Sequence, residues 1–206
     1  MTDILLNPAD ALVIVDVQND FLPGGALAVG QGGAIFPALR RYIDLFRERG
    51  LSIYASRDWH PAAHCSFHAQ GGIWPPHCIA GTGGAAFPEA LALPPSAVVI
   101  SKAVTPGADA YSAFQGTGLA DQLRAGRKQR LFIGGLATDY CVLHTVLDAL
   151  KEGFEVMLLS DAIRAVDVHP GDGAAAIDTM LGNGAVSATV DMIAGMAAAS
   201  AVRQAG

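Results

Sequence analysis

The sequence predicts one α/β domain spanning residues 1–206, built on a mostly parallel six-stranded sheet in three layers, with helices on both faces. Three observations carry this prediction. Six short apolar runs alternate with helical patterns, the apolar runs are continuous rather than alternating, and no repeat, linker or charge block divides the chain. Continuous apolar strands separated by helices are typical of a parallel sheet that is covered on both faces. A chain of 206 residues is long enough to bury a substantial core.

The expected strands are apolar runs of five to seven residues, rich in Val, Ile and Leu. They are Ala11–Val17, Leu51–Ser56, Ala97–Ser101, Leu131–Gly135, Val156–Ser160 and Ala185–Val190.

The expected helices show apolar residues at helical spacing. The first contains the stripe Ile35, Leu39, Tyr42, Ile43 and Phe46 and ends at Gly50. The others are Thr138–Glu152, Gly173–Leu181 and a last one over Met192–Arg203.

Composition excludes several classes of protein. Hydrophobic residues make up 51% and charged residues 16%, which excludes disorder. The net charge is −6, and the densest basic cluster is the short run from Arg124 to Arg130, so neither nucleic acid nor an anionic membrane is an expected partner. Residues 1–10 do not resemble a signal peptide, and the apolar stretch 193–202 is too short to span a bilayer. The three cysteines are an odd number and no recognisable signal peptide precedes them, so a reducing compartment, the cytoplasm, is the expected location.

Reactive side chains lie at the ends of four predicted strands. Asp16 lies at the end of the first strand, and Asp58 and His60 come just after the second. Lys102 directly follows the third strand, and Cys141 opens the helix after the fourth. Ligands of such folds bind outside the carboxyl ends of the strands, so these residues are expected to share one site.

Cys141 is the candidate nucleophile. Thr138 or Asp139 would cap the helix, and the free amides of its first turn would face the sulfur. The thiol is therefore expected to ionise more easily than a free cysteine, whose pKa is about 8.5. The alternative is a small hydrophobic side chain packed behind the sheet.

Asp16 and Lys102 are the candidate partners of that thiol. A carboxylate beside a thiol can remove its proton, and a lysine cation stabilises the resulting charges. Asp16 could instead cap a turn or helix, since the segment 16–20 is rich in capping residues, and Lys102 could be a solvated charge.

Asp58, His60 and His77 are candidate metal ligands. Side chains alternate along an extended segment, so Asp58 and His60 point the same way. One carboxylate and two imidazoles suit a divalent ion such as Zn²⁺ and leave further positions to water or substrate. Competing ligands lie nearby, namely His64, Cys65, His68 and Cys78. The two cysteines lack the close spacing of structural zinc sites, so we favour a catalytic type of site.

The glycine-rich segments do not form a dinucleotide-binding motif. Neither 30–33 nor 81–84 follows a strand and opens a helix with the required spacing, and Gly134-Gly135 lacks a third glycine at 138–140. A nicotinamide-dinucleotide oxidoreductase is therefore disfavoured.

From Ala11 to about Thr189, the chain resembles the isochorismatase-like cysteine hydrolases, and specifically the nicotinamidases (pyrazinamidases). The resemblance lies in DVQNDF (16–21) followed by PGGAL (23–27), SRDWHP (56–61), WPPHC (74–78), Lys102 with DAYSAF (109–114), and GLATDYC (135–141). One departure is Ala103, where many members have glycine.

The resemblance implies a role for each motif residue. It implies a catalytic triad of Asp16, Lys102 and Cys141, and a divalent metal ion held by Asp58, His60 and His77. It further implies a cis peptide before Ala137, an oxyanion hole formed by the amides of Ala137 and Cys141, a ring pocket lined by Phe21, Trp74 and Tyr111, and a water-mediated metal contact at Ser66. Zn²⁺ is the first expectation for the ion, and Fe²⁺ and Mn²⁺ accept the same ligands.

The implied function is hydrolysis of nicotinamide to nicotinate and ammonia through a cysteine thioester, in NAD salvage, with pyrazinamide as a further substrate. The alternatives are an amidohydrolase acting on an N-carbamoyl compound or a ureidoacrylate, an isochorismatase, or a non-catalytic domain of the same fold. The expected partner is a small-molecule substrate. The oligomeric state stays open, with a homo-oligomer as one option.

Overall fold

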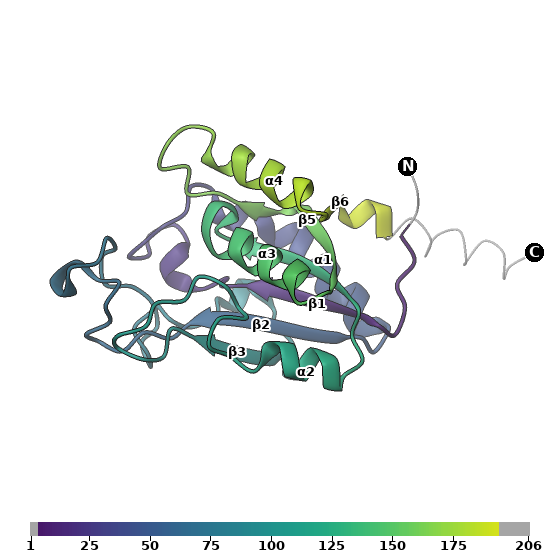
Figure 1. The fold of residues 1–206 in the computed structure, drawn as a ribbon, viewed down its shortest axis with the longest axis horizontal. Helices are drawn as coiled ribbons and strands as arrows, with labels where there is room; N and C mark the ends of the chain where they lie inside the picture. The colour runs from purple at the N-terminus through teal and green to yellow at the C-terminus, as the bar shows by residue number, and fades with distance from the viewer. Residues whose placement is uncertain (1–3, 194–206) are drawn as a thin grey trace, which may run out of the picture.

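The fold is a six-stranded sheet with helices on both faces, seen in a computed structural model that describes residues 4–193. The strand order is β3-β2-β1-β4-β5-β6, and every neighbouring pair is parallel (Figure 1). The strands are β1 (Asp10–Val15), β2 (Ser52–Asp58), β3 (Val98–Lys102), β4 (Arg130–Leu136), β5 (Glu155–Arg164) and β6 (Val186–Ala188). The predicted fold class is confirmed, and the sheet is parallel throughout.

All six predicted strands exist, but their ends differ in a way that matters for the site. β1 ends before Asp16, which adopts a left-handed backbone with φ of 48°. β2 extends to Asp58 and β3 to Lys102, and these two residues are paired in the sheet register. Both were predicted to follow their strands. They are instead the last residues of strands, because parallel pairing holds polar residues in the ladder as well as apolar ones.

Within residues 4–193, the sheet is covered by the α-helices α1 (Phe36–Glu48), α2 (Leu119–Ala125), α3 (Leu143–Lys151) and α4 (Asp172–Gly182). The sequence did not predict α2, which has only two buried residues, Leu119 and Leu123, and is too short for a periodic pattern. The predicted helix over 138–152 starts with a π-helical turn, Thr138–Val142, before α3. Of the predicted helix Met192–Arg203, residues 192–193 are helical and the rest lies outside the described residues.

The two faces of β1 pack into two separate cores. Leu12 and Ile14 belong to the core on the α1 face, whereas Ala11, Val13 and Val15 belong to the core under α2, α3 and α4. Successive side chains of a strand point to opposite faces, so a strand buried on both sides must be apolar throughout. This explains the continuous apolar run of β1 and confirms the three layers.

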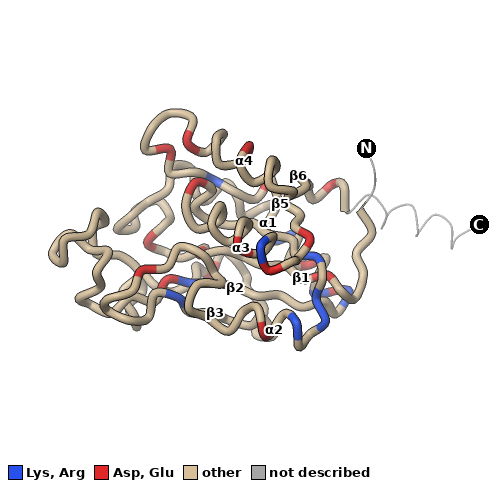
Figure 2. Tube along the Cα trace, viewed as in Figure 1, with Lys and Arg blue, Asp and Glu red and all other residues tan. Residues whose placement is uncertain are grey.

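The strands run toward the long loops on the left of Figure 1, so their carboxyl ends meet at one edge. The run of basic residues from Arg124 to Arg130 lies at the end of α2 and the entry to β4, away from those loops (Figure 2). Across residues 4–193, no helix combines the length and apolar character needed to cross a membrane.

Gly135 lets β1 and β4 approach closely beneath the candidate site. Its φ is +133°, and a Cβ atom there would lie 2.1 Å from the backbone oxygen of Val15. We expect Gly135→Ala to lower the free energy of unfolding by more than about 3 kcal/mol, because it adds a backbone clash to an unfavourable φ. Urea unfolding measures this loss.

Gly134→Ala is the matched control, because its Cβ would meet its nearest atom at 3.1 Å and its φ is ordinary. A Gly135→Ala protein as stable as this control would contradict the close-approach argument.

Candidate active site

Lys102 is the centre of the buried cluster at the carboxyl edge of the sheet. Its ammonium group donates to the carboxylate of Asp58 and to the carbonyl oxygen of Ala110 at 2.9 Å. It also lies 2.9 Å from Asp16 Oδ2 and 3.6 Å from Cys141 Sγ. The predicted convergence of Asp16, Lys102 and Cys141 is confirmed. The side chain of Lys102 is completely buried, so it is not a solvated charge.

The Asp16 carboxylate faces this cluster and caps no helix. Its Oδ1 accepts a hydrogen bond of 2.6 Å from the Ser56 hydroxyl. Its Oδ2 receives no aligned hydrogen bond within residues 4–193, although Lys102 Nζ is close. A carboxylate oxygen of Asp16 and the Cys141 sulfur lie within 4.8 Å of each other. One oxygen of Asp16 is therefore available to take a proton from the thiol.

The ionisable groups of the cluster differ in the direction of their pKa shifts. Burial alone lowers the pKa of Lys102, but Asp16 and Asp58 outweigh it and raise that pKa well above its usual value. Burial raises the pKa of Asp58, but Lys102 and His60 outweigh it and hold the pKa below its usual value. The pKa of Asp16 is raised, because burial and the nearby Asp58 outweigh the pull of Lys102. Asp16 is thus the better base of the two carboxylates.

The expectation of an easily ionised thiol is wrong. Burial raises the pKa of Cys141 well above its ordinary value, and Asp16 and Asp58 raise it further against the opposing effect of Lys102. The free-energy cost of desolvating a thiolate inside the cluster exceeds the stabilisation expected from the amides at the helix start, which is distorted into a π turn. The thiol needs a base to ionise, and Asp16 lies beside it.

The expected helix cap by Thr138 or Asp139 is also wrong. The cap position is Ala137, and no side chain bonds to the first turn. The carboxylate of Asp139 instead accepts two hydrogen bonds of 2.9 Å, from the backbone amides of Val166 and Asp167.

Asp58, His60 and His77 form a group suited to a divalent metal ion. One donor atom of each lies within 4.8 Å of the other two. Nδ1 of His77 donates to the carbonyl oxygen of Pro75 at 2.8 Å, which leaves the Nε2 lone pair free to bind a metal. Burial lowers the pKa of His77, so its imidazole is neutral, as a ligand must be. The donor set therefore fits a metal with three protein ligands and open positions.

The competing ligands do not join this group. Both ring nitrogens of His64 are engaged, with the Ser66 hydroxyl at 2.8 Å and the Ala108 carbonyl at 3.1 Å. His68 is exposed and bonds to the backbone of its own loop, and Cys65 and Cys78 are free thiols outside the group. The metal contact of Ser66 stays a prediction.

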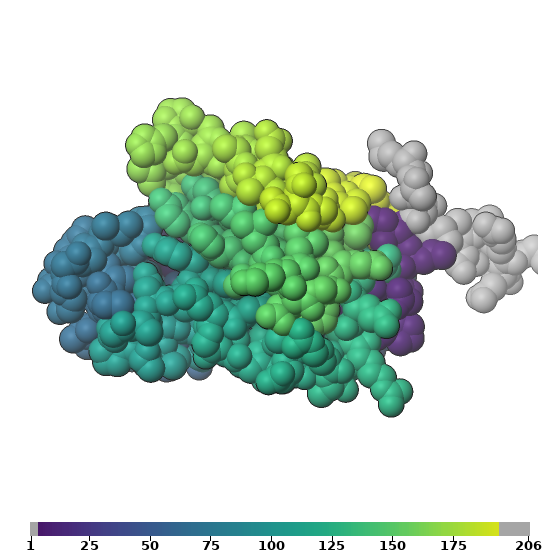
Figure 3. Space-filling model, viewed as in Figure 1, coloured from purple at the N-terminus to yellow at the C-terminus, as the bar shows by residue number. Residues whose placement is uncertain are grey.

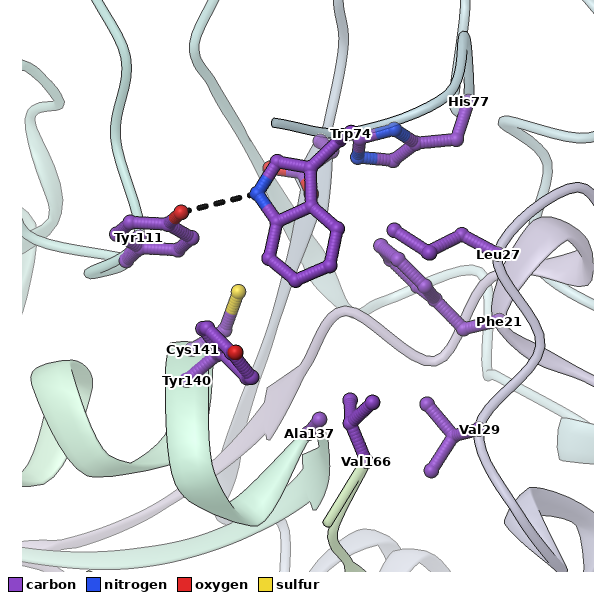
Figure 4. A pocket seen from close by; sticks show the side chains of 11 residues that line it. Phe21, Leu27, Val29, Trp74, His77, Tyr111, Ala137, Tyr140, Cys141 and Val166 are labelled. Carbon is purple, nitrogen blue, oxygen red and sulfur yellow. Dashed lines mark hydrogen bonds between the residues drawn. The ribbon is translucent and has the colours of Figure 1, made fainter. Parts of the chain in front are cut away.

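A small cavity opens beside both groups, where the blue and teal segments meet on the surface in Figure 3. Figure 4 shows the predicted ring-pocket residues on its walls, with the indole N–H of Trp74 donating to the Tyr111 hydroxyl at 3.0 Å. The full lining is Phe21, Leu27, Val29, Asp58, Trp74, His77, Tyr111, Ala137, Tyr140, Cys141 and Val166.

Four lining residues were missed by the sequence reasoning: Leu27, Val29, Tyr140 and Val166. Tyr140 had a signal, because it lies next to Cys141. Leu27 had one as well, because it ends the motif PGGAL (23–27). Val29 and Val166 are ordinary apolar residues in loops, and nothing in their local sequence distinguishes them from core residues.

Two backbone features bear on the resemblance. The peptide between Leu136 and Ala137 is cis, as the resemblance implies. Ala103, where many members have glycine, adopts a left-handed backbone with φ of 51°, so this turn keeps a glycine-like conformation without glycine. The oxyanion hole itself stays a prediction.

The comparison with protein families decides the membership of this chain. Residues 10–192 match the Isochorismatase domain. The chain belongs to the isochorismatase family. Among curated members, the nicotinamidase of Escherichia coli is 41% identical, over 89% of this chain and 96% of that protein.

Solved structures of the isochorismatase family agree with this fold. The pyrazinamidase of Pyrococcus horikoshii, solved in complex with zinc, is 48% identical with a TM-score of 0.85, and the match covers 88% of this chain and 99% of that one. A protein from L. infantum in complex with nicotinate is 37% identical with a TM-score of 0.84, covering 93% and 98%.

Proposed function

We propose that this protein is a nicotinamidase, which hydrolyses nicotinamide to nicotinate and ammonia in NAD salvage and also accepts pyrazinamide. The observation that carries the proposal is the meeting of two groups at one small aromatic cavity. The cluster of Asp16, Lys102 and Cys141 adjoins the group of Asp58, His60 and His77 through the bond between Lys102 and Asp58, and both contribute to the cavity lining. The similarity to the nicotinamidase of E. coli supports the same activity.

The proposed reaction starts with transfer of the thiol proton of Cys141 to Asp16, whose raised pKa suits it as a base. The sulfur then attacks the carboxamide carbon, and a C–S bond forms. When the C–N bond breaks, Asp16 returns the proton to the leaving nitrogen and ammonia departs. Water then hydrolyses the thioester, which yields nicotinate and restores the thiol.

Lys102 has two tasks in this scheme. Its ammonium group lies 3.6 Å from the sulfur, where it stabilises the thiolate. It also lies between Asp16 and Asp58 and offsets their mutual repulsion. A buried cation bound to two carboxylates stays charged throughout the cycle.

We propose that Asp58, His60 and His77 hold a zinc ion, as supported by their donor set and by the zinc complex of the pyrazinamidase. When bound, the ion supplies a Lewis acid that can hold the ring nitrogen of the substrate. Phe21 and Trp74, which line the cavity, would then contact the faces of the ring.

We also keep two predictions that rest on the sequence. One is a location in the cytoplasm, which agrees with three free thiols. The other is that the whole chain forms one domain.

Ammonia release from a panel of amides tests the proposed function. Nicotinamide and pyrazinamide should be hydrolysed, whereas an N-carbamoyl amino acid and a ureidoacrylate should not. Preference for either acyclic amide would support the related amidohydrolase instead. No turnover of any amide by the metal-loaded protein would support a non-catalytic domain.

Loss of the metal should weaken substrate binding. Chelation, or His77→Ala, should raise KM for nicotinamide by at least about tenfold, because the ligands are needed for the ion that orients the ring. Benzamide, which lacks the ring nitrogen, should be a poor substrate of the intact protein. Steady-state kinetics with metal analysis of the same samples measures both effects.

His68→Ala is the control, since this exposed histidine lies in the same loop outside the metal group. Full kcat/KM in the metal-free protein, or equal rates with benzamide and nicotinamide, would show that the ion does not orient the ring.

A further inference from the structure

The π turn that contains Cys141 is hydrogen-bonded to the segment that contains Val166, another residue of the cavity wall. Asp139, in the π turn 138–142, accepts the amide of Val166 on Oδ1 and the amide of Asp167 on Oδ2, both at 2.9 Å. Val166 lines the cavity together with Cys141. The carboxylate therefore links the candidate nucleophile to a residue 25 positions later in the chain.

The loop after β5 is also held from its other end. Asp167 has a left-handed backbone with φ of 52°, and its own carboxylate accepts the amide of Gly173 at 2.7 Å, in the first turn of α4. A Cβ at Gly173 would lie 2.5 Å from Cβ of Ala165, so the loop packs directly on the start of α4. The amides of Val166 and Asp167 are thus bonded to Asp139, and the side chain of Asp167 is bonded to the start of α4. The position of Val166 therefore depends on Asp139.

Val166 lies beside Ala137 in Figure 4, with Val29 next to it and Cys141 above. The side chains of Val29, Ala137 and Val166 line the cavity and are apolar, so only shape limits what fits against these three. A cavity wall made of branched aliphatic side chains distinguishes ligands by size, since an extra methyl group must displace one of them.

We propose that Asp139 is a positioning residue that sets the distance between Val166 and the Cys141 sulfur, and that Val166 thereby excludes ring-substituted amides from the cavity. This inference rests on the proposed function, since it concerns the shape of the same site. Asp139 contacts two backbone amides rather than the substrate.

Asp139→Asn tests the positioning role with little change in volume. The amide side chain keeps one acceptor but places an N–H group opposite one of the two backbone N–H groups. KM for nicotinamide should rise about tenfold with kcat within about twofold, because the wall moves while the buried cluster stays. Alkylation of Cys141 counts the active sites, so a loss of folded protein is not mistaken for this effect.

Asp172→Asn is the matched control. Asp172 also accepts one backbone amide of the same region, that of His169 at 2.9 Å, but His169 does not line the cavity as Val166 does. Its KM and kcat for nicotinamide should equal those of the unchanged protein.

The proposed exclusion of ring-substituted amides by Val166 is tested with ring-methylated nicotinamides. In Val166→Ala, the kcat/KM of at least one methylated amide relative to nicotinamide should rise about tenfold, and Asp139→Asn should shift the same ratio in the same direction. Unchanged ratios in both variants would overturn the proposal.

Hydrogen exchange gives a readout that does not need activity. Exchange at the amides of Val166 and Asp167 should accelerate at least about tenfold in Asp139→Asn and stay unchanged in Asp172→Asn. Equal exchange in both variants would overturn the positioning role even if the protein hydrolyses nicotinamide. If the unchanged protein hydrolyses no nicotinamide, the proposed function fails, while the exchange result still decides whether Asp139 holds the loop.

Discussion

Cys141→Ala is expected to lower ammonia release from nicotinamide by at least about 10⁴-fold, because the thioester needs a thiol and Cys141 supplies the thiol in the cavity lining formed by the described residues. The sulfur lines the cavity and lies 3.6 Å from Lys102 Nζ, with a carboxylate oxygen of Asp16 within 4.8 Å. Rates are to be measured with a coupled ammonia assay on protein of known metal content. The metal content should not change, since the group suited to the ion takes its donor atoms from Asp58, His60 and His77 and none from Cys141.

Cys65→Ala is the control for this variant. Cys65 is half-buried in the loop between β2 and β3, and its thiol does not line the cavity. This variant should keep its activity and its alkylation at Cys141. Ammonia release by Cys141→Ala above the level of a contaminating enzyme would exclude Cys141 as the nucleophile.

Lys102→Met is expected to lose most activity and to lower the free energy of unfolding by about 3–5 kcal/mol, because it leaves two buried carboxylates without their shared cation. Methionine matches the length of the lysine stem, so the loss reflects the charge rather than a cavity. The carboxylates concerned are those of Asp16 and Asp58, and the Ala110 carbonyl also loses its donor. Urea unfolding and the ammonia assay measure the two losses.

Lys151→Met, at the exposed end of α3, is the matched control and should change neither quantity. If Lys102→Met is as stable as this control, the carboxylates do not depend on Lys102. If its activity is unchanged, Lys102 does not stabilise the thiolate.

The sequence alone determined the architecture of this protein. Continuous apolar runs such as Ala11–Val15 can be recognised in the local sequence. They indicate strands that are buried on both faces, because such a strand must be apolar at every position. Because the carboxyl ends of parallel strands meet at one edge, residues at the ends of four strands could be assigned to one site before any distance was known. Asp16, Lys102 and Cys141 converge as that rule predicts.

Only the tertiary structure decided how these groups behave. The raised pKa of Cys141 depends on burial and on charges from Asp16 and Asp58, which come from other strands. Asp139 looked like a helix cap because its neighbours suggested one, but its partners lie 27 and 28 residues away. The desolvation of a buried group and its long-range hydrogen bonds both depend on residues that are distant in the sequence and that only folding brings together. Local sequence therefore determined which residues reach the site, and three-dimensional packing determined their protonation and the shape of the cavity around them.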